Sequence, residues 1–261
     1  MKIFIMTDLE GVAGVTTFGV DTNSNGKYYE RSKSFLTQEV NAAAQACFEK
    51  GASEILVADD HGAGAINIDE LHEDVQLLHG KNRVIPFGMD RGFDAMFIIG
   101  QHAMQGAAAA NMHHTMDQDK VISYWLNDIR IGEMGLYAYL GGYFDVPFIY
   151  LSGDKAACEE AKAFAPGITV TAVKEGISQT CAISLTPQKA RKMIKRDAGI
   201  ALDNAGKIKA LKIQGRVTLK MQFMSSDIVS QYALKKGVQV IDPLTVSYTA
   251  ENVFDACKIW Y

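Results

Sequence analysis

Cysteine is scarce in this chain, and no two cysteines have the spacing of a thiolate metal site or a redox pair. The four residues Cys47, Cys158, Cys181 and Cys257 are widely spread, so we expect reduced thiols rather than a disulfide framework. That use of cysteine is typical of a cytoplasmic protein, which is the location we expect. Cys47 and Cys158 lie in helical patterns and are interpreted as small core residues.

Long apolar runs and an excess of positive charge are also absent. No run of about 18 apolar residues occurs, and the short apolar N-terminal segment ends in acids rather than in a signal-peptide cleavage site. The formal net charge of −4 gives no indication of a nucleic-acid-binding surface. We therefore expect neither a membrane nor a nucleic acid as partner. With 48% hydrophobic residues, the chain has enough apolar material for a sizeable core.

Several enzyme signatures are missing. HEDVQ at His72 begins like the zinc-peptidase motif H-E-x-x-H, but Gln76 takes the place of the second histidine. GAGAIN lacks the third glycine of a dinucleotide fingerprint, and no Gly-rich loop carries a Walker A lysine. SGD at Ser152 does not match the G-x-S-x-G elbow. A serine hydrolase and a nucleotide-binding protein are therefore not indicated.

Short apolar strands alternate with helical patterns in the first part of the chain. We expect strands at 2–7, 54–58, 83–87, 94–100 and 147–151, a hairpin at 120–131, and helices at 30–50 and 133–144. Further on, we expect strands at 168–173, 216–223 and 238–241, and helices at 186–204, 227–236 and from 251.

This order predicts an α/β fold with a mainly parallel sheet and flanking helices, plus a smaller C-terminal α+β unit. We assign residues 1–165 to an α/β metal-binding catalytic domain and residues 166–261 to a C-terminal α+β domain.

Carboxylates and imidazoles follow three of the predicted strands. The first strand is followed by Asp8 and Glu10, the second by Asp59, Asp60 and His61, and the third by His102. Ligands bind at the carboxyl ends of parallel strands, so these residues converge on one edge if the strands are neighbours. All six histidines lie between positions 61 and 114, which directs attention to the same region.

The pair Asp8 and Glu10 needs a compensating cation. Alternate residues of a strand project to the same side, so the two carboxylates repel each other at close range. Carboxylates and imidazoles without thiolates suit Zn, Mn, Fe or Co, and a carboxylate can bridge two ions in a hydrolytic site. We therefore interpret Asp8 and Glu10 as metal ligands.

Each residue also has an ordinary structural alternative. These are a helix or turn cap for Asp8 and Glu10, a loop cap or a partner that orients a ligand histidine for Asp59 and Asp60, a turn residue for His61, a core histidine for His102, and a helix-dipole acid for Glu133.

An ordered set of motifs makes the chain similar to a known family. The motifs are TDLEGVAG, ADDHGAG, GQHA, MHHTM and NDIRIGEMGLYAYLGGYFDVPFIYLSGD, with YYERS and TAVKEGIS as further matches. In this order they resemble the DppA-type D-aminopeptidases, the M55 metallopeptidase family. The resemblance covers most of the chain and is looser toward the C-terminus.

The resemblance implies a zinc aminopeptidase with two ions that hydrolyses short peptides with D-amino acids at the N-terminus, such as D-Ala-D-Ala. The metal ligands it implies are Asp8, Glu10, His61, His102 and Glu133, with Asp8 as the bridge. The catalytic histidine it implies is His114, and the adjacent His113 is the alternative because the spacing from His102 departs from the family pattern.

The implied mechanism is metal-assisted amide hydrolysis, in which His114 shuttles a proton or stabilises the tetrahedral intermediate. The resemblance also implies a ring-shaped homo-oligomer, a decamer of two stacked pentamers. Two other functions fit the same residues. One is another metal-dependent amidohydrolase or phosphoesterase, and the other is a non-catalytic peptide-binding protein linked to peptide transport.

Overall fold

Two β-sheets organise the chain in the computed structural model, which describes residues 1–80 and 85–260. Within these residues the larger sheet has seven strands. In spatial order they are β3 (Gln76–Leu78), β2 (Glu54–Asp59), β1 (Lys2–Thr7), β4 (Ala95–Gln101), β7 (Phe148–Asp154), β8 (Thr169–Ser178) and β9 (Cys181–Ser184). Neighbouring strands are parallel from β3 to β8, and β9 pairs with β8 in the antiparallel direction.

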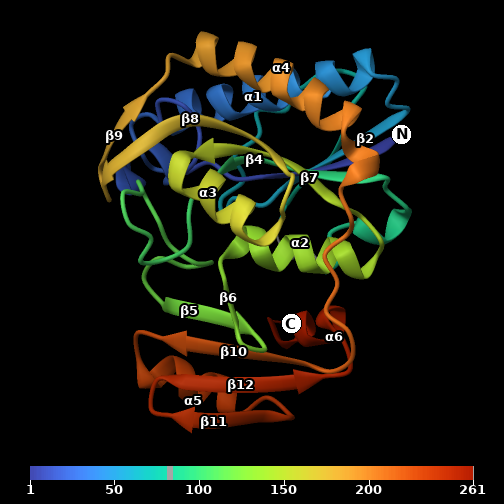
Figure 1. The fold of residues 1–261 in the computed structure, drawn as a ribbon. Coiled ribbons are helices and arrows are strands. Elements are labelled where there is room, and N and C mark those ends of the chain that lie inside the picture. Colours follow the sequence, from blue (N-terminus) through green and yellow to red (C-terminus); the bar gives the residue numbers. More distant parts are fainter. Residues whose placement is uncertain (81–84, 261) are drawn as a thin grey trace.

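Helices cover both faces of the larger sheet. Figure 1 shows α1 (Tyr29–Glu49) and α4 (Pro187–Asp203) on one side, and α2 (Glu133–Tyr143) and α3 (Lys155–Phe164) on the other. The apolar run of β1 serves both faces, because Ile3 and Ile5 pack into the core under α1 while Phe4 and Met6 pack into the core under α2. A strand that is buried on both faces has a continuous apolar sequence, and this pattern predicted a buried strand at residues 2–7.

The smaller sheet is antiparallel and lies beyond α2 (Figure 1). Its strands, in spatial order, are β11 (Val238–Asp242), β12 (Thr245–Ala250), β10 (Val217–Phe223), β5 (Val121–Leu126) and β6 (Ile129–Ile131). The helices α5 (Ser226–Ala233) and α6 (Val253–Cys257) pack on it. Every second residue of β10 is buried, so one face of this sheet belongs to the core that it shares with α2.

Short helical turns complete the described chain. They are a π-helical turn η1 (Phe18–Thr22) and the 3-10 turns η2 (Met89–Arg91), η3 (Ala205–Lys207) and η4 (Lys258–Trp260). None of the helices in the described residues combines the length and the apolar character that crossing a bilayer requires.

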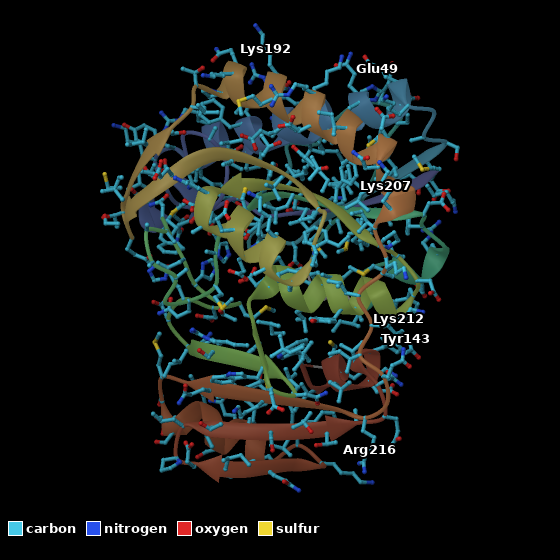
Figure 2. All side chains as sticks on the ribbon, viewed as in Figure 1. Glu49, Tyr143, Lys192, Lys207, Lys212 and Arg216 are labelled. Carbon is cyan, nitrogen blue, oxygen red and sulfur yellow. The ribbon has the colours of Figure 1, made fainter. Side chains whose placement is uncertain are left out.

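The segment between α4 and β10 joins the two sheets. Figure 2 shows Tyr143 and Lys212 at this junction. The Nζ atom of Lys212 lies 2.5 Å from Oδ1 of Asp145, and the ring of Tyr143 stacks on Phe254 with centroids 5.6 Å apart. Contacts between residues far apart in the sequence therefore hold the end of α2 against the smaller sheet.

The predicted fold class is confirmed, with differences in detail. The strand expected at 83–87 is wrong for 85–87, which form a turn, and residues 83 and 84 lie outside the described residues. The strands β5 and β6 precede residue 165 but belong to the smaller sheet, whereas β8 and β9 follow it and belong to the larger one. The sheets therefore do not divide at residue 165, because strands pair in space regardless of their separation along the chain. The division into domains 1–165 and 166–261 stays a prediction.

Candidate metal centre

The topology of the larger sheet brings three predicted site residues to one edge. The strand β1 lies between β2 and β4 and is parallel to both, and Thr7 pairs with Asp59 on one side and with Ile99 on the other. The chain continues from these three strand ends into Asp8, His61 and His102. The expectation that the three strands are parallel neighbours is confirmed.

Six side chains form two adjoining groups at this edge. One group comprises Asp8, Glu10 and His61, and the other comprises His102, His114 and Glu133. Within each group the possible ligand atoms all lie within 4.8 Å of one another. All five residues predicted as metal ligands thus lie together with the predicted catalytic histidine, and their roles stay a prediction.

Glu133 and His114 reach the site from outside the three strand ends. Glu133 is the first residue of α2, and His114 lies in the irregular segment between β4 and β5. The backbone N–H of Met116 donates to Oε1 of Glu133 at 2.5 Å, which links the two segments. The second group therefore combines one strand end, one loop and one helix start.

Asp8 connects the two groups. Its Oδ1 lies 3.5 Å from Nδ1 of His61, and its Oδ2 lies 3.0 Å from Nε2 of His102. The backbone N–H of Leu9 donates to Oδ1 at 2.8 Å and helps to fix the carboxylate. One oxygen of Asp8 thus faces each group, which is the geometry a bridging carboxylate needs.

A glycine lets the loop after β1 pass close to the end of β4. The N–H of Gly11 donates to the carbonyl oxygen of Gly100 at 2.7 Å. A Cβ atom on Gly11 would lie only 2.1 Å from the carbonyl oxygen of Gln101. Only glycine permits this approach, which accounts for the glycine in the D-x-E-G motif and places Glu10 beside His61.

Each of the three histidines donates one ring N–H to a backbone carbonyl. The pairs are Nε2 of His61 with Thr22 at 2.8 Å, Nδ1 of His102 with Ala103 at 2.9 Å, and Nδ1 of His114 with Met112 at 3.0 Å. A carbonyl oxygen only accepts, so the bonded nitrogen carries the proton and the other nitrogen faces the carboxylates. Metal-binding histidines are commonly oriented in this way.

The nitrogen of His102 that faces the carboxylates is buried and has no hydrogen-bond partner among the described residues. This Nε2 lies 3.0 Å from Oδ2 of Asp8 and 3.6 Å from Oε1 of Glu133. A nitrogen lone pair facing two carboxylates is unfavourable unless a cation compensates it. The donor set, with its nitrogen and oxygen atoms and no thiolate, fits zinc in a catalytic site.

The charged groups of the site lower the pKa of the neighbouring acids and raise the pKa of the neighbouring imidazoles. Burial alone would raise the pKa of Asp8 and of Glu133, but the neighbouring imidazoles lower both below their ordinary values. Burial alone would lower the pKa of His61 and of His102, but the carboxylates raise both well above the ordinary value. Protons on the imidazoles and a divalent cation are therefore alternative ways to compensate these carboxylates.

The two adjacent histidines have different surroundings. The imidazole of His114 lies in the second group, with Nε2 3.6 Å from Oε1 of Glu133. The Nδ1 atom of His113 instead accepts a hydrogen bond from the backbone of Gly106 at 3.1 Å, and burial lowers the pKa of His113. Of the two candidates for the catalytic histidine, His114 is the one that lies with the predicted ligands.

A cavity of about 470 Å³ opens over both groups. Its volume lies in the range of small-ligand sites, roughly 300–1,000 Å³. Besides the predicted site residues, its lining includes Phe18, Asp60, Met116, Asp117 and Asp119. The wall is therefore rich in carboxylates, and a positively charged ligand group complements it.

Asp59 and Asp60, whose roles the sequence left open, differ in the structure. Asp59 accepts hydrogen bonds from the backbone N–H groups of Ala65 and Ile66, so it shapes the loop that carries His61. Asp60 lines the cavity and accepts a hydrogen bond from the hydroxyl of Tyr137. Sequence reasoning missed Tyr137, although its position one turn after the Glu133 position on the same helix was an available signal.

The chain is similar to known proteins over its whole length. The sequence profile of peptidase family M55, described as D-aminopeptidase, matches residues 1–261. A D-aminopeptidase from Bacillus subtilis (strain 168) is 32% identical over 264 residues, which cover 98% of this chain and 94% of the relative.

A solved structure described as the Zn-dependent D-aminopeptidase DppA from Bacillus subtilis, a self-compartmentalizing protease, has a similar fold. It matches with a TM-score of 0.93 and 29% identity, over 100% of this chain and 95% of that chain. The family that the sequence motifs predicted is confirmed. This chain belongs to the D-aminopeptidase family of metal-dependent peptidases, M55.

Proposed function

We propose that the protein is a zinc aminopeptidase with two metal ions, which hydrolyses short peptides with a D-amino acid at the N-terminus, such as D-Ala-D-Ala. The observation that carries this proposal is the position of Asp8, whose two oxygens face His61 and His102 separately. Family membership supports the peptidase activity, and the zinc dependence of the similar solved structure supports zinc as the metal.

In this proposal Asp8 is shared by two metal sites. Glu10 and His61 complete one site, and His102 and Glu133 complete the other. When bound, the two divalent ions would polarise the scissile carbonyl and lower the pKa of the attacking water. The chain itself contributes ligands of fixed orientation, because the histidines are held by backbone carbonyls.

His114 is the proposed proton carrier. Its Nδ1 proton is bound to the carbonyl oxygen of Met112 at 3.0 Å, so Nε2 is the atom that exchanges protons in the cavity. This nitrogen takes a proton from the attacking water and returns it to the leaving amine. Glu133, with Oε1 3.6 Å away, stabilises the imidazolium that forms between the two steps.

The cavity wall supports recognition of a free N-terminus. Asp60 and Asp119 line the cavity outside the two groups, and their carboxylates complement the ammonium group of a peptide. An N-acylated peptide lacks this charge and places a bulkier group in the same space. We therefore propose that the free amine is required for efficient turnover.

A substrate panel tests the proposed function. It contains D-Ala-D-Ala, L-Ala-L-Ala, N-acetyl-D-Ala-D-Ala and a chromogenic phosphate ester, each assayed with zinc-loaded protein and with the chelator-treated protein as control. We expect the highest kcat/KM for D-Ala-D-Ala, and no turnover after chelation. Preference for the L-dipeptide or the phosphate ester would overturn the substrate assignment, and unchanged activity after chelation would overturn the metal mechanism.

We further propose that the protein assembles into a homo-oligomeric ring, a decamer of two pentamers. The description of the similar solved structure as a self-compartmentalizing protease supports assembly of copies. Light scattering coupled to size exclusion measures the mass directly. A monomeric or dimeric mass at micromolar concentration would contradict the ring.

A further inference from the structure

A lysine on β8 lies buried behind the candidate metal centre. Lys174 is only 3% exposed, and its Nζ atom makes three hydrogen bonds. The acceptors are the carbonyl oxygen of Glu10, the carbonyl oxygen of Val15 at 2.6 Å and Oδ1 of Asn111 at 2.8 Å. All three donors of the ammonium group are used, so a buried charge is here fully hydrogen-bonded.

Asn111 extends these contacts toward His114. It is completely buried, and its Nδ2 atom donates to the carbonyl oxygens of Thr16 and Gln179, both at 3.0 Å. The next residue, Met112, donates its backbone N–H to the same Gln179 oxygen at 3.0 Å. Asn111 therefore joins the loop after β1, the segment that carries His114, and the turn between β8 and β9.

The sequence of β8 is adapted to this contact. Gly176 lies two residues after Lys174, so both face the same side of the strand. A Cβ atom on Gly176 would lie 2.3 Å from the backbone nitrogen of Asn111. Lys174 thus donates to the side chain of Asn111, and Gly176 lets the strand pass close to the backbone of Asn111. These two contacts give a physical reason for the K-E-G sequence within TAVKEGIS.

These contacts connect two segments that lack regular secondary structure. Glu10 follows the end of β1, and His114 lies in the long connection between β4 and β5. Single backbone hydrogen bonds tie each segment to the end of β4, from Gly11 to Gly100 and from His114 to Ala103, but no strand ladder joins the two, so side-chain contacts from the rigid sheet help to set the distance between them. Lys174 and Asn111 provide such contacts directly, because together they bond to both segments.

We propose that Lys174 is a positioning residue, which together with Asn111 holds the loop of Asp8 and Glu10 in register with the segment of His114. The inference rests on the proposed function of these residues as metal ligands and proton carrier. Lys174 acts through the backbone of Glu10 and through Asn111. It therefore affects metal affinity and turnover without forming part of the cavity wall.

The experiment compares Lys174→Met with a control on the same strand. Thr171→Val removes a buried hydroxyl that bonds to Tyr150 at 2.7 Å and to Asp197 at 2.8 Å, on the α4 side of the sheet. Both variants lose buried hydrogen bonds of β8, so both report a general loss of stability through the melting temperature. Only Lys174→Met changes the contacts to the candidate metal centre.

Cobalt is the probe of the site, since its visible absorption reports ligand geometry without any peptide substrate. We expect Lys174→Met to weaken cobalt binding about tenfold to a hundredfold and to change the absorption bands. Thr171→Val should keep the wild-type spectrum and cobalt affinity, although its melting temperature should be similar to that of Lys174→Met. Wild-type affinity and spectrum in Lys174→Met, or equal changes in both variants, would overturn the proposal.

Asn111→Ala provides a second variant that remains informative if Lys174→Met does not fold. This change keeps the bonds from Lys174 to the carbonyl oxygens of Glu10 and Val15 but removes the bonds of the Asn111 side chain to Lys174, Thr16 and Gln179, and so loosens the segment of His114. We expect cobalt affinity within about threefold of wild type and a kcat lowered at least tenfold at unchanged KM. An unchanged kcat would overturn the coupling to His114.

Failure of this inference is distinguishable from failure of the proposed function. Wild-type protein that binds cobalt but cleaves no peptide would refute the aminopeptidase assignment, while the cobalt comparison would still decide the role of Lys174. Wild-type protein that cleaves D-Ala-D-Ala, together with unaffected variants, would refute the positioning role alone.

Discussion

The imidazole rings of His102 and His114 are stacked, with centroids 3.8 Å apart and planes inclined by 15°. The Nε2 atoms of both rings lie 3.6 Å from the same oxygen, Oε1 of Glu133. Two protonated imidazoles at this distance would repel each other strongly. Because the two rings are stacked and share this oxygen, a positive charge held by one ring acts directly on the other.

Replacement of the two adjacent histidines tests which one transfers protons. We expect His114→Ala to lower kcat by a factor of about 10²–10⁴ at unchanged metal content, because the five proposed ligands remain. His113→Ala should have a small effect, because His113 contacts the loop at Gly106 rather than the cavity. Steady-state kinetics with elemental analysis measures both. A larger loss in His113→Ala than in His114→Ala would reverse the assignment.

Zinc binding should release protons at pH 7. Burial alone would lower the pKa of His61 and of His102, but the carboxylates raise both well above the ordinary value, so protons compete with zinc for these rings. Zinc binds only the neutral ring, so these protons must leave and the affinity should fall as the pH is lowered. Calorimetric titrations in two buffers of different ionisation enthalpy count the released protons. Heats that do not depend on the buffer would contradict this expectation.

Glu39 should make folding stability dependent on pH. This carboxyl of α1 is only 1% exposed, its Oε1 accepts from the N–H of Ala13 at 3.1 Å, and burial raises its pKa to about 7 from an ordinary value of 4.5. Between these two values the folded state binds more protons than the unfolded state, so stability falls as the pH rises. The loss is of the order of 3 kcal/mol above pH 7.

Glu39→Gln removes this ionisation at nearly the same volume. Relative to wild type, the variant should therefore be more stable at pH 8 than at pH 5. Glu49→Gln is the matched control, because Glu49 lies on the same helix with its side chain 54% exposed and paired with Lys195. Denaturant unfolding at both pH values measures the difference. Equal differences at pH 5 and pH 8 would show that Glu39 does not titrate in this range.

Gly11→Ala should disturb both the fold and the site. The added Cβ would meet the carbonyl oxygen of Gln101 at 2.1 Å, and the displaced loop carries Glu10. We expect a loss of about 1–3 kcal/mol in the free energy of unfolding, together with weaker zinc binding. Gly206→Ala is the control, because a Cβ there has no atom within 4 Å. Similar stability and zinc affinity in the two variants would contradict the account of the D-x-E-G motif.

The sequence predicted one half of the candidate site for a clear physical reason. Continuous apolar runs identified β1, β2 and β4 as buried parallel strands, and the carboxyl ends of such strands must share an edge. Asp8, His61 and His102 could therefore be brought together without knowledge of the structure.

The other half depends on contacts that no local pattern encodes. Glu133 and His114 reach the site through the connection to the smaller sheet, where Leu126 pairs with Leu219. Their positions were predicted only from the resemblance to the family. The Lys174–Asn111 contact spans 63 positions in the sequence, and the strands β3 and β9 are too short to show a period.

Metal content after reconstitution tests the central claim most directly. Wild-type protein is loaded with zinc, freed of excess metal and analysed for zinc per chain, beside the Asp8→Asn variant. The shared position of Asp8 predicts about two zinc ions per wild-type chain and at most one in the variant. A wild-type chain that holds no more than one ion, or a variant that keeps both, would contradict the account.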